Sequence, residues 1–301
     1  MRKNFSFLKN SQIKLFSVSL VVALAFSSCK KDINKTKDLT LNITGLEDLG
    51  ATARYEGWII TGGNPVSTGV FTVNASGQLS KTNFEVNKSD LANATAFVLT
   101  IEPFPDTDPA PSAQHILAGD FSAANASLSI GHSAALNTTF LTAAGKYVLA
   151  TPSTPVTTDE LSGLWFINLT TGSPTAGLNL PALPTGWKYE GWALISGRPV
   201  STGVFTSSSG ADASSPFSGT GGVPPFPGED FIMNAPTGLT FPTNLSGGAA
   251  VISVEPFPDN SPLPFLLKPL VGNIPSPASD HFTYNMALNT VSFPTGNAIR
   301  D

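Results

Sequence analysis

The sequence predicts an all-β protein built from two tandem antiparallel β-sandwiches of immunoglobulin-like type. Three observations lead to this fold class. Short apolar runs rich in Val, Ile, Phe, Tyr and Trp alternate with turns that use many of the 27 Gly and 25 Pro. No stretch keeps the apolar period of a helix over a useful length. A long motif occurs twice in the 301 residues, which indicates a duplicated domain.

Residues 1–28 are typical of a bacterial export signal. Four basic residues, Arg2, Lys3, Lys9 and Lys14, precede the apolar run 15–26. A helix of this length reaches about 18 Å, which is less than the ~30 Å hydrocarbon core of a bilayer. We therefore expect a signal peptide at 1–28 and no membrane-spanning helix in the chain.

Cys29 is the only cysteine, so the sequence excludes an intrachain disulfide and a cysteine-based zinc site. It follows two serines after the apolar run and resembles the lipidated cysteine of bacterial lipoproteins, although Phe26 stands where that family usually has Leu, Val or Ile. The resemblance implies a lipid anchor at Cys29, followed by a polar tether at 29–38. Two alternatives are cleavage after Ala25, which would leave a free thiol, and a buried structural cysteine.

The charge of the chain disfavours a nucleic-acid partner. The formal net charge is -5, and only 12% of residues are charged. Residues 1–28 hold four of the 16 basic residues and no acidic one, so the mature chain is more acidic still. A phosphate backbone would be repelled by such a chain.

The internal repeat sets the domain organisation. Residues 55–72 recur as 189–206, and residues 98–106 recur as 251–259, with an insertion between 206 and 249. A weaker match pairs 135–138 with 287–290. We expect one sandwich at 39–158 and a second at 159–301. The apolar runs 147–151 and 164–168 have no counterpart in the second copy, and we expect them to bridge the two units.

Each copy is expected to start with a hairpin and continue to a central strand. Residues 56–60 lead through a Gly-Gly-Asn-Pro turn into 66–71, which is the pattern of a β-hairpin. Residues 98–101 are apolar at every position, which indicates a strand covered on both faces.

The order Tyr-Glu-x-Trp, Pro-Val-Ser-x-Gly-Val-Phe and then a strand ending in Glu-Pro occurs at 55–71 and 98–103 and again at 189–205 and 251–256. It resembles the extracytoplasmic C-terminal domain of anti-sigma-K factors, over 39–121 and 178–274. The resemblance implies an extracytoplasmic sensing or interaction module. Phe104 and Phe257 depart from the small residues of that family.

The same resemblance implies that the chain does not sequester a sigma factor directly. Anti-sigma factors of this type carry a cytoplasmic sigma-binding region and a transmembrane helix. This sequence resembles them in neither part. It also lacks the His and Cys cluster of zinc-bearing anti-sigma domains. We therefore expect no direct sigma-factor contact.

The sequence does not predict an enzyme. It contains three histidines, His115, His132 and His281, and none lies in a motif that combines a nucleophile, a base and an orienting acid. We expect surface or turn histidines, no catalytic residue, no cofactor and no metal.

The loops that follow the two Glu-Pro motifs are the candidate binding site. Glu102 and Glu255 occupy the same position in the two copies and allow two interpretations. They could contact a ligand or calcium together with nearby aspartates, or they could accept backbone N–H bonds at the start of each loop, which we favour. The candidate site residues are Glu102, Phe104, Asp106, Glu255, Phe257 and Asp259, and Asp108 lies close by.

Aromatic side chains offer a second type of binding surface. Tyr55, Trp58, Tyr189 and Trp192 could stack on sugars, but residues three apart on a strand face opposite sides, so one of each pair is expected in the core. Exposure is expected instead for Phe104, Phe257 and the Pro-rich run 224–227, and packing of the phenylalanine over the end of a sandwich is the equal alternative.

These observations predict a non-catalytic lipoprotein of the cell envelope, anchored through Cys29 on a periplasmic or surface face, that recognises an envelope protein or glycan. The first alternative is a carbohydrate-binding surface lipoprotein of a polysaccharide-uptake system. The second is a structural envelope component whose two domains only space other components.

Overall fold

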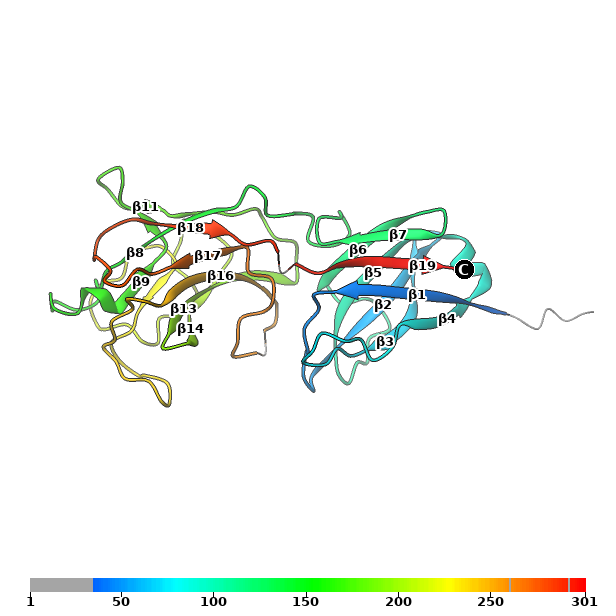
Figure 1. Cartoon of the computed structure of the whole chain (residues 1–301), viewed down its shortest axis with the longest axis horizontal. Helices are drawn as coiled ribbons and strands as arrows, with labels where there is room; N and C mark the ends of the chain where they lie inside the picture. The colour runs from blue at the N-terminus through cyan, green and yellow to red at the C-terminus, as the bar shows by residue number, and fades with distance from the viewer. Residues whose placement is uncertain (1–34, 260, 292) are drawn as a thin grey trace, which may run out of the picture. The chain divides into compact units, whose positions relative to one another are not determined.

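The expected all-β fold is confirmed in a computed structural model, which describes residues 35–301 other than 260 and 292. The signal peptide, Cys29 and most of the expected tether lie outside the described residues. Residues Lys35–Asp301 form one compact unit that contains two large antiparallel sheets (Figure 1). In the part of the chain that the structure describes, no helix is long and apolar enough to cross a membrane.

The first sheet contains eight strands in the order β3-β2-β5-β6-β7-β19-β1-β4. One short helix, α1 (Lys88–Ala92), connects β4 to β5 and is capped by the side chain of Asn87. The strands are β1 (Thr36–Thr44), β2 (Ala53–Thr61), β3 (Asn64–Phe71), β4 (Asn83–Asn87), β5 (Ala94–Pro103), β6 (His115–Ser122), β7 (Asn125–Ser129) and β19 (Thr295–Arg300).

The second sheet follows the order β14-β13-β16-β17-β18-β8-β9-β15, with β12 also paired to β8. A separate two-stranded sheet joins β10 (Ile167–Asn168) to β11 (Thr175–Ala176), and a 3₁₀ turn covers Glu160–Ser162. The strands of the large sheet are β8 (Ala144–Leu149), β9 (Gly163–Trp165), β12 (Leu178–Asn179), β13 (Trp187–Ile195), β14 (Arg198–Phe205), β15 (Gly228–Asp230), β16 (Ala249–Pro256), β17 (Leu270–Asn273) and β18 (Tyr284–Leu288).

Side-chain packing closes the first sheet into a sandwich. Phe71 of β3 and Phe84 of β4 stand at opposite ends of the strand order, yet their ring centroids are 6.0 Å apart. The predicted central strand lies in β5, where the seven consecutive residues from Ala96 to Glu102 are buried. Phe97 and Leu99 face the main core, whereas Val98 packs on the opposite face with Trp58. The expectation of a strand covered on both sides is therefore confirmed.

The predicted hairpin is confirmed as β2–β3 and recurs as β13–β14. Ile59 pairs with Val66, and the turn between the strands uses Gly62 and Gly63 at φ 58° and 80°. These positive φ values favour glycine, which explains the Gly-Gly sequence at the turn. The second hairpin turns through Ser196 and Gly197.

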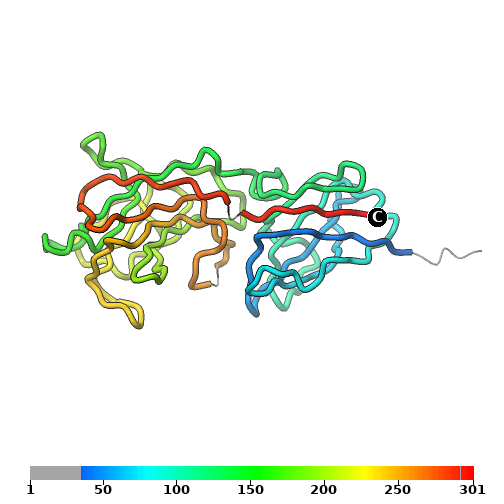
Figure 2. The backbone as a smooth tube through the Cα atoms, viewed as in Figure 1, coloured from blue at the N-terminus to red at the C-terminus, as the bar shows by residue number. Residues whose placement is uncertain are grey.

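The last strand of each repeat lies in the sheet of the other repeat. β8 follows the motif at 135–138, and β19 follows its counterpart at 287–290. β8 nevertheless pairs with β18 of the second sheet, and β19 pairs with β7 and β1 of the first. Figure 1 shows β19 beside β1, and Figure 2 shows the chain leaving the first sheet after β7 and returning at its C-terminal end. The two sandwiches therefore complete each other by a reciprocal strand exchange.

Because of this exchange, several segments lie in a different sandwich from the one expected from sequence. The division between the sheets does not coincide with the expected boundary between residues 158 and 159, because β8 lies in the second sheet and β19 in the first. The runs expected to bridge the units instead contribute β8, β9 and β10 to the second half. Residues 36–38, assigned from sequence to the tether, start β1 and pair with β4.

Candidate functional site

Two buried glutamates fasten the loops that follow β5 and β16. Glu102 accepts hydrogen bonds from the backbone N–H of Ser112, at 2.9 and 3.2 Å, and Glu255 accepts from that of Phe265, at 2.9 and 3.1 Å. Both side chains are almost fully buried. The backbone hydrogen bonds that we favoured are therefore present at both residues, and each carboxylate closes its own loop.

A hydroxyl group on the same strand and a tryptophan on the neighbouring strand support each glutamate. Thr100 donates to Glu102, and Ser253 donates to Glu255. The indole N–H of Trp58 donates to the Thr100 hydroxyl at 2.8 Å, and that of Trp192 donates to the Ser253 hydroxyl at 2.7 Å. Each repeat thus contains a buried chain that runs from tryptophan through a hydroxyl to a carboxylate.

The Ser-Thr-Gly part of the repeated motif forms a β-bulge that brings a further glutamate into the site. In the second hairpin, Gly191 pairs with Gly203 and Trp192 pairs with Ser201, which leaves Thr202 as the extra residue. The bulge lets the Ser201 hydroxyl donate to Glu190 of β13. The first hairpin has the same bulge at Thr68, and Ser67 donates to Glu56.

Burial changes the acidity of these groups. Burial raises the pKa of Glu190 to about 7, and hydrogen bonding from Ser201 opposes the rise. Burial also raises the pKa of Glu255 to about 8, and the nearby Glu190 and Asp259 add to it. Burial also raises the pKa of Glu56. Desolvation of a carboxylate is the common reason.

The two phenylalanines of the candidate loops are exposed and each lies under a cation. Phe104 is 53% exposed and Phe257 is 44% exposed. The guanidinium carbon of Arg54 lies 4.2 Å from the Phe104 ring centroid, and Lys188 Nζ lies 3.4 Å from that of Phe257. Cation–π contacts of this kind hold an exposed ring in a fixed orientation.

Both candidate loops line one hollow of about 590 Å³. A hydrogen bond of 2.6 Å from the Gln114 side-chain amide to the Phe257 carbonyl connects the loops. The structure therefore brings together residues that lie far apart in sequence. The carboxylates of the lining are those of Glu47, Asp48, Glu102, Asp106, Asp108, Glu255 and Asp259.

Sequence reasoning missed Glu190 and Glu47. Glu190 is nearly fully buried beside Glu255, and its signal was present, since Tyr-Glu-Gly-Trp is identical in both repeats. Glu47 lines the hollow, and burial raises its pKa to about 7, with Lys268 acting in the opposite direction. No sequence pattern marks Glu47, because it stands outside the repeated motifs.

The aromatic residues considered for sugar stacking are all in the interior. Tyr55, Trp58, Tyr189 and Trp192 are each less than 5% exposed. The expectation that one of each pair is core was too cautious, because both faces of these strands are covered. Phe104 and Phe257 remain as the exposed rings at the candidate loops.

The three histidines contact carboxylates or backbone groups. His115 Nδ1 lies 2.9 Å from the Ala134 carbonyl. His132 lies 3.3 Å from Asp120, and His281 lies 3.3 Å from Asp280. His132 and His281 lie in a bend and a turn, as expected, whereas His115 is the half-buried first residue of β6.

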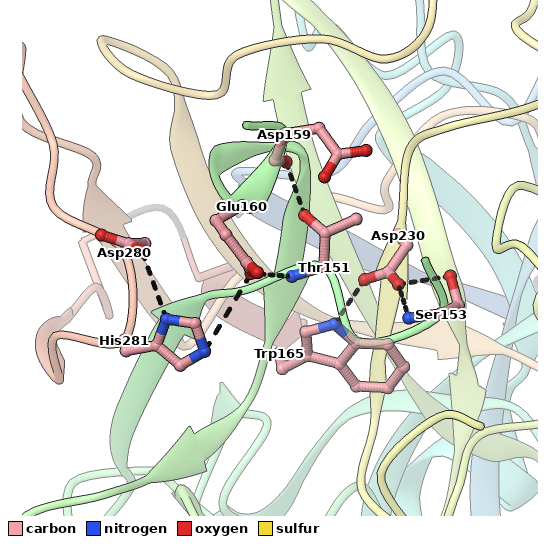
Figure 3. A network of polar contacts seen from close by, with 8 residues as sticks. All are labelled: Thr151, Ser153, Asp159, Glu160, Trp165, Asp230, Asp280 and His281. Atoms are coloured by element: carbon pink, nitrogen blue, oxygen red, sulfur yellow. Dashed lines mark hydrogen bonds and ion pairs between the residues drawn. The ribbon is translucent and has the colours of Figure 1, made fainter. Parts of the chain in front are cut away.

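A second buried polar network surrounds Asp230 of β15 (Figure 3). The Asp230 carboxylate accepts hydrogen bonds from the Trp165 indole at 2.7 Å and from the backbone N–H of Ser153 at 2.8 Å, and the Ser153 hydroxyl donates as well. Nearby, Glu160 accepts from the Thr151 backbone at 3.0 Å and lies 4.0 Å from His281. The Asp230 contacts tie β9 and β15 to the chain segment that follows β8.

Raising the pH from about 5 to about 8 is expected to lower the free energy of unfolding. Burial raises the pKa of Glu229 from 4.5 to about 7, and burial also raises the pKa of the nearby Asp212 and Asp230. Each such group binds its proton more tightly when folded, so stability is lost as the pH rises between the unfolded and folded pKa values. For Glu229 the full effect is roughly 3 kcal/mol.

Urea unfolding at both pH values measures this loss, and Glu229→Gln provides the control. The Gln variant keeps the volume without titrating, so its stability should change less between the two pH values. An equal change in both proteins would contradict the assignment to Glu229.

No protein-family model, curated protein or solved structure matches the chain. What it binds therefore has to be inferred from its own residues.

Proposed function

We propose that the chain is a non-catalytic recognition module of the bacterial cell envelope, held to the membrane by a lipid on Cys29. The observation that carries this proposal is the convergence of both Glu-Pro-Phe-Pro loops on one acidic hollow. Each loop is fixed by a buried glutamate, and an exposed phenylalanine stands at its start. Preorganised loops with an exposed aromatic ring are suited to binding, because little conformational entropy is lost.

The lining favours a partner that carries positive charge or many hydrogen-bond donors. Carboxylates dominate the polar groups of the hollow, and proline side chains supply much of its apolar wall. A basic segment of an envelope protein has this chemistry. The resemblance to the external domain of anti-sigma-K factors supports a sensing role of the same kind.

A carbohydrate ligand is the second candidate, and the exposed phenylalanines favour it. Carboxylates beside an aromatic ring can bind sugar hydroxyls while the ring stacks on the apolar sugar face. Only Phe104 and Phe257 can stack in this way at the candidate loops, since the tryptophans considered from sequence are buried.

Photocrosslinking in the native envelope tests the proposal. A photoreactive phenylalanine analogue at position 104 or 257 is expected to capture a discrete partner, because both positions are exposed and adjoin residues that line the hollow. Asp106→Asn and Asp259→Asn should weaken capture about tenfold, as expected when a contact worth about 1.4 kcal/mol is lost. The same analogue at Val70, which is 53% exposed on β3, is the matched control.

The outcomes separate the proposed ligands. Identical adducts from positions 70, 104 and 257 would contradict a specific site. A glycan-array signal that Phe257→Ala abolishes, without a protein adduct, would favour the carbohydrate candidate. Cys29→Ser should move the protein from the membrane fraction to the soluble fraction and remove a lipid from its intact mass; an unchanged distribution would contradict the anchor.

A further inference from the structure

Three carboxylates of the second repeat meet at one point. Glu190 comes from β13, Glu255 from the end of β16 and Asp259 from the loop that follows. One oxygen of each lies within 4.8 Å of one oxygen of each of the others. Glu190 is only 5% exposed and Glu255 only 1% exposed, so two of the three groups are withdrawn from water. Like charges this close repel strongly unless something neutralises them.

The second oxygen of Glu190 has no hydrogen-bond partner within the described residues, although it is buried. Its first oxygen accepts from Ser201. A buried carboxylate oxygen without a donor is costly, and native structures seldom leave one unused. This unpartnered oxygen is an observation independent of the clustering, and it points to a cation as a ligand of Glu190.

The other ligands are positioned to complete such a site. Glu255 is held by the Ser253 hydroxyl and the Phe265 backbone, so its carboxylate cannot move away from Glu190. Asp259 lines the open hollow, which gives an ion access from solvent.

Lys188 and Lys268, which lie near Glu255, hold other groups with their ammonium ends. Lys268 Nζ donates to the carbonyls of Pro264 and Phe265, at 3.2 and 2.7 Å. Lys188 Nζ lies over the Phe257 ring at 3.4 Å. Neither contact supplies a hydrogen bond to Glu190.

We propose that Glu190, Glu255 and Asp259 bind one calcium ion. All three ligands are carboxylates, which favour hard cations over the softer transition metals. Calcium accepts six to eight oxygens in irregular geometry, so bidentate carboxylates and water from the hollow can complete its shell. Magnesium requires a near-ideal octahedron, which a site on one strand, one strand end and one loop is less suited to provide. The site shares Glu255 and Asp259 with the lining of the hollow, but calcium binding requires no partner and can be measured on the chain alone.

The first repeat contains a matched control for this site. Glu56, Glu102 and Asp106 occupy the equivalent sequence positions, and Ser67 donates to Glu56 as Ser201 does to Glu190. Glu56 is more exposed than Glu190. Among the described residues, the second-repeat set is the one group of three such side chains close enough to hold an ion. Binding should therefore occur at one site per chain.

Calorimetric titration of the EDTA-treated full chain with CaCl₂ tests the proposal. We expect one site with a Kd of about 10⁻⁴ to 10⁻³ M, the range of extracellular calcium modules. Calcium at a concentration of about 100 Kd should also raise the Tm, because it binds only the folded chain. Glu190→Gln and Asp259→Asn should each weaken binding at least about tenfold. Glu56→Gln and Asp106→Asn should leave the affinity within about twofold.

Asp259→Asn is expected to fold normally, because residue 259 lies in a loop and not in the core. The test therefore remains decisive even if Glu190→Gln misfolds. Three outcomes would overturn the proposal. One is the absence of both heat and a Tm shift at 10 mM calcium. Another is full affinity in both second-repeat variants. The third is an equal loss in the first-repeat variants, which would show diffuse attraction to the acidic hollow.

Discussion

A chain that ends at residue 294 is expected to lose the folded first sandwich. The deletion removes β19, which stands in the middle of the first sheet and not at its edge. β19 pairs with β1 over six residues and with β7 over five. Without it, two strand edges lose their partners and the interior beside Ala298 opens to water.

Arg300 adds to the size of this effect. Its guanidinium donates to the carbonyls of Leu91, Ala94 and Ala123 at 2.8 to 3.0 Å, and it lies 4.5 Å from the Phe121 ring centroid. With net contributions of about 1 kcal/mol per hydrogen bond, the deletion should cost at least about 5 kcal/mol. That is comparable with the whole stability of many domains.

Urea unfolding followed by circular dichroism and hydrogen exchange measures the loss. We expect fast exchange in β1, β6 and β7, with the strands of the second sheet less affected. Arg300→Ala, which keeps the strand, should cost only about 1–3 kcal/mol. A synthetic peptide of residues 288–301 should restore protection when added in trans. A truncated chain that unfolds at the same urea concentration as the full chain would contradict the importance of the exchange.

The sequence predicts the elements of this fold better than their partners. Both hairpins and the central strand follow from local patterns, because turn glycines and continuous apolar runs are short-range signals. No short-range signal of this kind predicts the exchange of β8 and β19. The repeat is visible as far as 138 and 290, but the following strands have diverged, with Tyr147 and Val148 in one and Asn297 and Ala298 in the other. A strand carries no mark of which of two similar sheets it will join.

The candidate site could likewise be predicted only in part from the sequence. Repetition singled out Glu102 and Glu255, and the prolines after them indicated loops. Burial of Glu190 could not be predicted, because an acidic residue in a strand is usually exposed. Its position depends on a bulge in the neighbouring strand and on a covering layer that is distant in sequence.

Asp230→Ala is expected to destabilise the second sandwich by about 3–5 kcal/mol. Asp230 is fully buried, and its carboxylate is the acceptor for the Trp165 indole and the Ser153 backbone N–H. Alanine would leave both donors buried without an acceptor, and each such donor costs about 1–3 kcal/mol. The space left by the carboxylate adds a cavity beside the rings of this network.

Asp230→Asn separates the loss of acceptors from the loss of volume. Asparagine fills the space, but its amide group presents N–H donors where one carboxylate oxygen accepted, so it can serve only one of the two buried donors well. Its cost should fall between wild type and alanine, at about 1–3 kcal/mol. Chemical unfolding gives the energies, and near-ultraviolet circular dichroism reports on the packing of Trp165. If alanine cost less than asparagine, the donors must find other acceptors or water, and Asp230 would not be the residue that holds β9 and β15 to the segment at Ser153.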